Sequence, residues 1–265
     1  MLSVLGVSAA FPEQATITAM DETTIRRLTQ LNRDFYRTVG EEFDRTRGQP
    51  WPGWLILWAH LAVPAAPGVF SVLDVGCGNG RLGLFLAERL PAGVALHYHG
   101  LDTDASLLDR AAQALAGHGV APILEQRDII ACPPEAGIYD LVALFGVLHH
   151  VPGRATRLAL LRALAERVAP GGLLAFTCWR FYEYARFRAR IVPWPDDLAG
   201  QVEAGDYLLD WRQGASALRY CHYVDDAEHA ALIAATDLEV AAIYRADGRS
   251  GDSNLYALLR RTASR

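Results

Sequence analysis

The feature that most constrains this 265-residue chain is a glycine-rich turn in "LDVGCGNGRLG", residues 73–83. Gly76, Gly78 and Gly80 follow an apolar, strand-like run and precede a helix-like stretch. That context is typical of the first turn of a β-α-β unit, where glycine lets the backbone approach a bound nucleotide. The turn therefore predicts a nucleotide-binding crevice at the end of the first strand of a parallel sheet.

From residue 72 onward, apolar strand-like runs alternate with helix-like stretches. Strands are expected in succession within residues 71–76, 95–102, 121–128, 139–146 and 171–178. Intervening helices are expected to begin near Arg81, Ala105 and Arg154. Strands and helices that alternate at this spacing form a parallel sheet covered by helices on both faces. The pattern therefore predicts an α/β fold.

The end of the chain predicts a different connection. A helix is expected over about 225–236, followed by strands within 238–247 and 254–261. The turn "ADGRSGDSN" between these strands is short enough to join them as an antiparallel pair. Because no internal repeat or low-complexity linker occurs, residues 25–265 are predicted to form a single domain.

Three segments lie outside the alternating pattern. Residues 1–24 are expected to be an N-terminal extension without ordered structure. Apolar residues at helical intervals predict a helix near the start of 25–61, a segment expected to act as a lid with Tyr36 as its contact to the ligand. Residues 179–224 are irregular and rich in aromatics and arginine, and are expected to be an insertion on the substrate side.

Composition excludes several classes of function. All 25 basic residues are arginine, so Schiff-base chemistry and a P-loop lysine are excluded. A net charge of −5 gives no basic footprint for DNA. The four cysteines lack metal-ligand spacing, which favours reduced thiols in the cytoplasm and no metal site.

Membrane and export signals are also not expected. No run of eighteen apolar residues occurs, which argues against a transmembrane helix. The apolar start "MLSVLGVSAAF" lacks the basic region of a secretory signal. Met20 is an alternative first residue, because it opens a segment with good helix-start chemistry. A cytoplasmic location is therefore expected.

Two kinds of nucleotide compete for the glycine turn. Gly78, Gly80 and Gly83 satisfy G-x-G-x-x-G, which is typical of NAD-dependent enzymes. Asp74 argues against a dinucleotide, because a carboxylate near the turn would repel the pyrophosphate. S-adenosylmethionine has no phosphate, and its methionyl ammonium would be attracted by Asp74. We therefore expect S-adenosylmethionine as the cofactor, with a dinucleotide as the alternative.

Two further acids follow strands in register with the glycine turn. Asp102 is placed to accept both ribose hydroxyls, and Asp104 is expected to cap the next helix. Asp128 is suited to accept from the adenine amine, while Ile129 packs against the base. The complete set of expected cofactor-binding residues is Asp74, Gly76, Gly78, Gly80, Asp102, Thr103, Asp128, Ile129 and Phe145.

The segments that carry these residues resemble the successive motifs of class I S-adenosylmethionine-dependent methyltransferases. They are "VLDVGCGNG", "GLDTD", "RDI", "YDLVALFGVLHHV" and "APGGLLAFT", between Val72 and Thr177. The resemblance implies a Rossmann-like, seven-stranded, mostly parallel sheet with helices on both faces and an antiparallel last strand. It also implies a cofactor at the carboxyl ends of the central strands, in agreement with the crevice rule for such sheets.

Methyl transfer needs alignment and exclusion of water, and needs a base only if the acceptor must lose a proton. His149, after the fourth strand, is a candidate base, with bracing of its loop as an equally open alternative. His150 is expected to pack or to face solvent. Trp179, after the fifth strand, is expected beside the cofactor. Arg219 and His222 are expected to clamp an anionic acceptor, with an ion pair to the core as the open alternative.

The flanks resemble the tRNA wobble-uridine methyltransferases, which esterify 5-carboxymethyluridine. The matching positions are Thr46, Arg47, Pro50, Trp51, Pro52, Trp179, Arg219, Tyr220 and His222, with Cys221 where the family has an aromatic residue. The resemblance implies a base-free site in which arginine and histidine hold a carboxylate. It also implies a partner, because eukaryotic members work with a small zinc-binding activator protein.

Other functions stay open at this point. The lack of lysine and the negative net charge disfavour tRNA, because affinity for nucleic acid comes largely from neutralised phosphates. A small-molecule O- or N-methyltransferase closed by residues 179–224 is the alternative. A module that binds S-adenosylmethionine without turnover is a third hypothesis. The acceptor, tRNA or a small molecule, is not named by the sequence.

Overall fold

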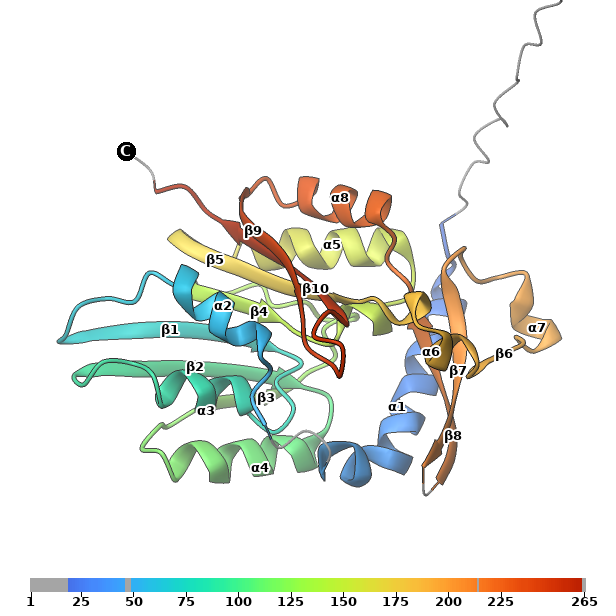
Figure 1. Cartoon of the computed structure of the whole chain (residues 1–265), viewed down its shortest axis with the longest axis horizontal. Helices are drawn as coiled ribbons and strands as arrows, with labels where there is room; N and C mark the ends of the chain where they lie inside the picture. The colour runs from blue at the N-terminus through green and yellow to red at the C-terminus, as the bar shows by residue number, and fades with distance from the viewer. Residues whose placement is uncertain (1–18, 46–48, 214, 264–265) are drawn as a thin grey trace, which may run out of the picture.

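The alternating pattern forms a seven-stranded sheet in the computed structural model, which describes residues 19–45, 49–213 and 215–263 (Figure 1). Its strands are β1 Gly68–Val75, β2 Val94–Asp102, β3 Ile123–Gln126, β4 Tyr139–Leu144, β5 Val168–Trp179, β9 Glu239–Ala246 and β10 Asn254–Arg260. The order across the sheet is β3-β2-β1-β4-β5-β10-β9. Strand β10 runs antiparallel to both β5 and β9, and the pairs among β1 to β5 are parallel. The expected seven-stranded, mostly parallel sheet with an antiparallel last strand is confirmed.

Helices cover both faces of this sheet, as expected. They are α2 Gly53–His60, α3 Arg81–Ala87, α4 Ala105–Ala116, α5 Arg154–Ala165 and α8 Asp226–Ala234. Leucines of α5 and α8 pack on one face, and Trp54 of α2 packs with Phe85 of α3 on the other. These buried side chains recur at helical spacing, which is why the sequence pattern predicts the helices.

The strand order changes direction at β1, which pairs with β2 on one side and β4 on the other. In such sheets the crevice outside the carboxyl ends of the strands, at this switch point, is where ligands bind. The fold therefore places the glycine turn after β1 and the histidine pair after β4 at the same edge.

A second, smaller sheet differs from the irregular insertion that the sequence predicts for residues 179–224. It contains β6 Ile191–Val192, β7 Asp206–Gln213 and β8 Ala215–His222, in the antiparallel order β6-β7-β8. Short helices α6 Ala185–Arg188 and α7 Asp196–Ala199 and a 3-10 turn, Phe181–Glu183, complete the insertion. Another 3-10 turn, Leu148–His150, follows β4.

The N-terminal helix α1, Glu22–Arg45, lies against β8 beside the carboxyl ends of the large sheet (Figure 1). It begins before the expected position 25. Of the segment expected to be a lid, α1 lies on the ligand side, whereas α2 packs into the core through Trp54 and Leu57. Residues 1–18 of the expected extension lie outside the described residues. Among the described residues, no helix combines the length and the apolar composition needed to cross a bilayer.

Candidate active site

A cavity opens at the carboxyl ends of β1, β2 and β4, beneath α1. Its walls come from the glycine turn, the segment after β3, the end of α2 and the inner face of α1. The expected cofactor residues line this cavity with the exception of Gly80. Gly80 precedes α3 with a φ of 78° and packs against Ala111 of α4. It therefore lies on the side of the turn that faces α4 rather than the cavity.

The glycine turn fits a ligand laid directly against its backbone. Gly76 has a φ of 75°, and a side chain there would collide with Val147. Gly78 lines the cavity with a φ of 53°, and no atom lies within 4 Å of the place that a Cβ would occupy. Both positions therefore favour glycine, and the surface that they form is a cradle for a flat or extended ligand.

Asp74 is a buried carboxylate in the cavity wall, 4% exposed, and accepts a hydrogen bond of 2.6 Å from the Tyr98 hydroxyl. Burial raises the pKa of Asp74 to about 7, the Tyr98 hydrogen bond lowers it, and the negative charge of Asp102 adds to the increase. A cation placed in the cavity would stabilise the ionised form. This is the environment expected for a site that receives an ammonium group.

Asp102 lies in the same wall at the end of β2. Its Oδ2 accepts from the Gly78 amide at 2.8 Å, and its Oδ1 accepts from the Asp104 amide at 3.0 Å. Burial raises the pKa of Asp102, while these two backbone hydrogen bonds lower it. The carboxylate is thus oriented by the backbone, as a ribose-binding group must be. Asp104 caps α4, as expected, by accepting from the amides of Ser106 and Leu107.

Asp128 and Ile129 line the opposite end of the cavity. Asp128 Oδ1 accepts from the Ile130 amide at 3.0 Å, and Oδ2 pairs with Arg33 of α1 at 2.5 Å. The group expected to receive the adenine amine is therefore also paired with helix α1. Thr103 and Phe145 also line the cavity.

Tyr36 and His150 lie where α1 closes over the end of β4, and both line the cavity. The Tyr36 hydroxyl is 2.8 Å from Nε2 of His150, and Nδ1 of His150 is 3.0 Å from the Tyr220 carbonyl oxygen. Nδ1 of His150 also lies 3.2 Å from the Asn32 side-chain amide nitrogen, which is a donor. The carbonyl oxygen is nearer and can only accept, so we assign the proton to Nδ1, and Nε2 then accepts from Tyr36. The structure thus places the expected lid contact Tyr36 at the cavity. His150 also lines the cavity, whereas the sequence predicted that it would pack or face solvent.

The residues expected at the reacting face form a cluster beside this cavity rather than its wall. The His149 ring lies 4.0 Å from His150 and 5.2 Å from Trp179, between ring centroids. The Arg219 guanidinium lies 4.7 Å from the Trp179 ring and 5.4 Å from the Phe35 ring. Arg219 is 7% exposed, and no carboxylate among the described residues pairs with it.

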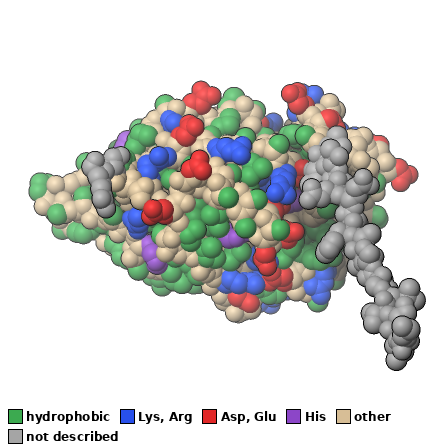
Figure 2. All heavy atoms as spheres, turned by 90° about the horizontal axis from the view of Figure 1, so that it is seen from above, with side chains coloured by type: hydrophobic (Ala, Val, Ile, Leu, Met, Phe, Trp, Pro, Cys, Tyr) green, Lys and Arg blue, Asp and Glu red, His purple; other side chains and the backbone are tan. Residues whose placement is uncertain are grey.

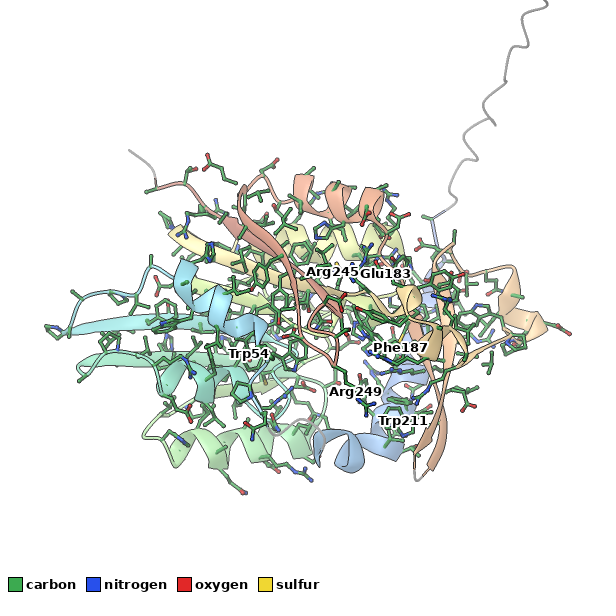
Figure 3. The ribbon with its side chains drawn as sticks, in the orientation of Figure 1. Trp54, Glu183, Phe187, Trp211, Arg245 and Arg249 are labelled. Carbon is green, nitrogen blue, oxygen red and sulfur yellow. The ribbon has the colours of Figure 1, made fainter. Side chains whose placement is uncertain are left out.

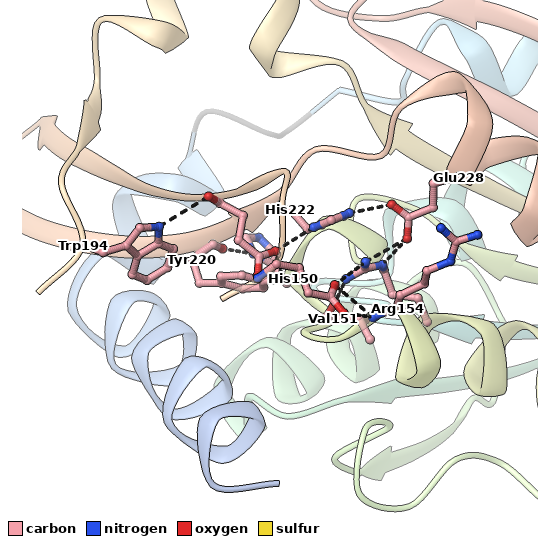
Figure 4. Close-up of polar contacts among 10 residues, drawn as sticks. His150, Val151, Arg154, Trp194, Tyr220, His222 and Glu228 are labelled. Carbon is pink, nitrogen blue, oxygen red and sulfur yellow. Dashed lines mark hydrogen bonds and ion pairs between the residues drawn. The ribbon is translucent and has the colours of Figure 1, made fainter. Parts of the chain in front are cut away.

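His222 lies outside this cluster, which argues against its expected role in an anion clamp. Its Nδ1 and Nε2 are each 2.6 Å from a carboxylate oxygen, of Asp206 and Glu228 respectively (Figure 4). The reason is strand geometry: successive residues of β8 point to opposite faces, so Arg219 and His222, three apart, cannot share one. The alternative left open for His222, an ion pair that holds the insertion to the core, is the one that the contacts favour.

Within the described part of the chain, two groups of side chains have metal-ligand chemistry. They are His149, His150 and Cys221, and Glu203, Asp206 and His222. In the second group, His222 is held by two carboxylates and Glu203 pairs with Arg157 at 2.9 Å. Burial raises the pKa of the Cys221 thiol to about 11, which disfavours the thiolate that metal binding needs.

The seven-stranded sheet, the glycine cradle and the acidic residues along the cavity define a class I, S-adenosylmethionine-dependent methyltransferase. Residues 73–174 match the model of the methyltransferase domain family. The chain belongs to this class of enzymes, and S-adenosylmethionine is its cofactor.

Among curated proteins, a trans-aconitate 2-methyltransferase of Azoarcus sp. (strain BH72) is 28% identical over 219 residues, 68% of this chain and 81% of that protein. An uncharacterized methyltransferase of Mycobacterium tuberculosis is 39% identical over 129 residues, 48% of this chain and 59% of that protein. A tRNA (carboxymethyluridine(34)-5-O)-methyltransferase of Macaca fascicularis is 25% identical over 197 residues, 73% of this chain but only 26% of that protein.

Solved structures show the same fold. A S-adenosylmethionine-dependent methyltransferase of Methanosarcina mazei superposes with a TM-score of 0.61 at 17% identity, covering 82% of this chain and all of that chain. An amino pentose methyltransferase of Micromonospora echinaspora, solved with S-adenosylmethionine bound, gives a TM-score of 0.57 at 24% identity, over 84% and 97% of the two chains.

Proposed function

We propose that this methyltransferase esterifies a carboxylate acceptor, and the observation that carries the proposal is Arg219. Its guanidinium is buried and lies against the rings of Phe35 and Trp179, and no carboxylate of the described residues forms an ion pair with it. A buried charge without a counterion costs several kcal/mol. A carboxylate bound there would supply the missing counterion, and a guanidinium fork matches its geometry.

Methyl transfer to a carboxylate requires the protein to hold and align the two reactants but not to remove a proton. When bound, S-adenosylmethionine supplies a methyl group on a cationic sulfur. Arg219 would hold and orient the acceptor carboxylate, while Trp179 and Phe35 keep the guanidinium in one place by stacking on it. The acceptor is already an anion, so no residue has to remove a proton. Helix α1 excludes water from the cavity, which favours transfer between held groups.

The identity of the acceptor is also part of the proposal. Relatives of this chain are named for trans-aconitate and for carboxymethyluridine in tRNA, and both acceptors carry a carboxylate. In the face that Figure 2 shows, acidic and basic side chains are interspersed rather than gathered. Such a surface holds a polyanion less well than a continuous basic patch does. A small carboxylic acid and the modified wobble uridine are therefore two sources of the same chemistry. The activator protein belongs to the proposal that tRNA is the acceptor, whereas a cytoplasmic location is proposed for either acceptor.

Transfer of labelled methyl from S-adenosylmethionine separates these sources. The enzyme is incubated with bulk tRNA and, separately, with an extract of small metabolites, and each product is treated with mild alkali. A methyl ester releases its label as methanol. Label that survives alkali in both samples would contradict esterification, whichever acceptor is methylated.

Substitution of Arg219 tests the clamp. Arg219→Gln should lower kcat/KM for the acceptor by about 10- to 150-fold, the range for loss of a hydrogen bond between charged groups. Affinity for the cofactor, measured by calorimetry, should stay within about twofold. Arg186→Gln is the matched control, because Arg186 also stacks on aromatic rings but is exposed. Equal activity of Arg219→Gln and the wild type would remove the clamp.

A second candidate function is O- or N-methylation of an acceptor that must lose a proton. The Tyr36–His150 pair favours it, because neutral Nε2 of His150 can accept a proton through the Tyr36 hydroxyl. In this case the label would be stable to alkali. Tyr36→Phe would then lower the rate of methyl transfer.

A further inference from the structure

The main chain of Tyr220 links the cavity to the small sheet (Figure 4). Tyr220 is on β8, which lies at an edge of that sheet, so the main-chain groups on its free side need partners from other elements. Its amide donates to Oδ1 of Asn32 in α1 at 2.9 Å, and its carbonyl oxygen lies 3.0 Å from Nδ1 of His150. One residue therefore contacts both the lid helix and the histidine that lines the cavity.

The Tyr220 side chain is held by buried charged groups. Its hydroxyl donates to Oδ1 of Asp206 at 2.8 Å. The same oxygen lies 2.6 Å from Nδ1 of His222, whose Nε2 lies 2.6 Å from Oε2 of Glu228, so the His222 ring donates from both nitrogens. Burial alone would lower the pKa of His222, but its hydrogen bonds to Asp206 and Glu228 raise it. The fully buried phenol of Tyr220 therefore has a fixed acceptor, and a shift of β8 would break that hydrogen bond away from water.

The insertion has another attachment to the large sheet, which lies elsewhere. Glu183 pairs with Arg245 of β9 at 2.6 Å, and both side chains are partly exposed (Figure 3). The hydrogen bonds of Asp206, by contrast, lead through Tyr220 to His150. The two attachments can therefore be changed separately, and the inner one is connected to the cavity.

The Tyr220 carbonyl also selects between the two tautomers of His150. A carbonyl oxygen only accepts, which favours the proton on Nδ1 and leaves Nε2 to accept from the Tyr36 hydroxyl at 2.8 Å. The side-chain amide nitrogen of Asn32, 3.2 Å from Nδ1, is a donor and would favour the proton on Nε2 instead. The position of the Tyr220 carbonyl therefore decides the direction of the Tyr36–His150 hydrogen bond.

That direction matters because the cofactor that the cavity receives carries a positive charge. A Tyr36 hydroxyl that donates to His150 can present only its oxygen lone pairs to the cavity, whereas one that accepts from His150 has its own proton free to point there. An oxygen acceptor is the more favourable neighbour of a cation. We propose that Asp206 and His222 are positioning residues that act through Tyr220. They keep the proton of His150 on Nδ1 and thereby make the Tyr36 oxygen an acceptor that faces the cationic cofactor.

Calorimetry with S-adenosylmethionine and S-adenosylhomocysteine, on full-length protein without acceptor, tests the assignment. The second ligand lacks the methyl group and the positive charge but keeps the rest of the molecule. Tyr220→Phe removes the bond to Asp206 and should weaken binding of S-adenosylmethionine about 3- to 10-fold, the range for loss of one neutral hydrogen bond. Binding of S-adenosylhomocysteine should change by less than about twofold. His222→Leu should have the same effect, whereas His222→Asn keeps a donor for Asp206 and should keep the wild-type ratio.

Nitrogen NMR of the His150 ring reads the tautomer. Its signals, assigned by their loss in His150→Asn, should show the proton on Nδ1 in the wild type and an exchange between both nitrogens in Tyr220→Phe. Tyr139→Phe is the control by chemistry, because it removes another buried tyrosine hydroxyl that bonds a histidine, His99 at 2.7 Å. Arg245→Gln is the control by place, because it loosens the other attachment of the insertion. Neither control should change the tautomer or the ratio of the two dissociation constants.

The ratio separates positioning from a loss of fold, which thermal unfolding of each variant without ligand identifies. A wild type with the proton on Nε2 would overturn the proposal. So would a Tyr220→Phe variant with the wild-type ratio, or one that binds both ligands more weakly by the same factor. None of these results bears on esterification of a carboxylate, which is read from the product.

Discussion

At the scale of single residues, Asp74 combines burial with a charge, and this combination links ionisation to cofactor binding. Burial raises its pKa to about 7, and the hydrogen bond from Tyr98 and the charge of Arg81 oppose the increase. The ionised form attracts the methionyl ammonium, whereas the protonated form does not. Protonation of Asp74 and binding of the cation therefore exclude each other, and linkage makes the affinity depend on pH.

We expect the affinity for S-adenosylmethionine to fall as the pH drops below about 7. Each pH unit below the pKa should weaken binding by up to about tenfold, because a growing share of Asp74 must first lose its proton. Calorimetry between about pH 5.5 and pH 8.5 measures this. Asp74→Asn should bind weakly at all these pH values and lose the dependence.

A ligand without the amino-acid tail provides the control for Asp74. Methylthioadenosine contacts the ribose and adenine sites but brings no ammonium near Asp74. Its affinity should change little where that of S-adenosylmethionine falls. A pH-independent affinity of the wild type for S-adenosylmethionine would contradict the assignment of Asp74.

The acidic residues that line the cavity were predictable from sequence because each lies at or just after the end of a strand. Asp74, Asp102 and Asp128 take their positions from the ends of β1, β2 and β3, and strand ends are readable from apolar runs. The acceptor side was less predictable. Which of His149 and His150 faces the cavity depends on the 3-10 turn after β4, and spacing does not show that turn.

At the scale of elements, the small sheet was missed because its polar residues are satisfied only in three dimensions. Asp206 is the first residue of β7 and is buried, although aspartate at this position of the sequence is more typical of a turn. In the fold it accepts from the Tyr220 hydroxyl at 2.8 Å and bonds His222. Its other oxygen accepts from the Glu203 amide at 2.8 Å, which is a local turn contact. The partners that place it in a strand are on β8, so no local pattern could indicate that this stretch is a strand.

Helix α1 stays over the cavity through buried apolar side chains, among them Leu28, Phe35 and Val39, and through polar contacts. Asn32 accepts from the Tyr220 amide at 2.9 Å, and Tyr36 bonds His150. The Arg33–Asp128 pair is partly exposed, with side chains 41% and 24% accessible, so it contributes at most about 1 kcal/mol. The inner hydrogen bonds are therefore the ones expected to hold the lid closed.

Removing one of these bonds should loosen the lid. We expect Tyr36→Phe to cost about 0.5–1.5 kcal/mol of lid closure, the usual value for a neutral hydrogen bond. Backbone amides of α1 should then exchange with solvent roughly 2- to 10-fold faster, as mass spectrometry would show. The ring contact with Phe35 is kept in this variant.

A change on the outer face of the same helix is the control for Tyr36. Arg37 pairs with Asp34 on that face and is 72% exposed. Arg37→Gln should leave exchange in α1 unchanged. If Tyr36→Phe also exchanges at the wild-type rate, α1 is held by other contacts and the hydroxyl has no part in closure.

At the scale of the whole molecule, a buried ion network joins the insertion to the core (Figure 4). Arg157 of α5 is 1% exposed and bonds Glu203 at 2.9 Å and Glu228 at 2.8 Å. Glu228 continues to His222, and His222 to Asp206. Burial alone would raise the pKa of Glu228, but the His222 and Arg157 contacts outweigh it and lower the pKa to about 2. The network therefore carries mutually compensated charges from α5, α8, β7 and β8.

Loss of the central cation should destabilise the whole protein. Arg157→Met leaves the Glu203 and Glu228 carboxylates buried without their guanidinium, which typically costs about 3–5 kcal/mol. For a chain of this size the unfolding midpoint should fall by roughly 6–20 °C, as calorimetry or circular dichroism would show. Arg162→Met is the matched control, because Arg162 is an exposed arginine on the same helix, and its midpoint should change by no more than about 2 °C. Similar midpoints for both variants would mean that the insertion is held to the core by contacts other than this network.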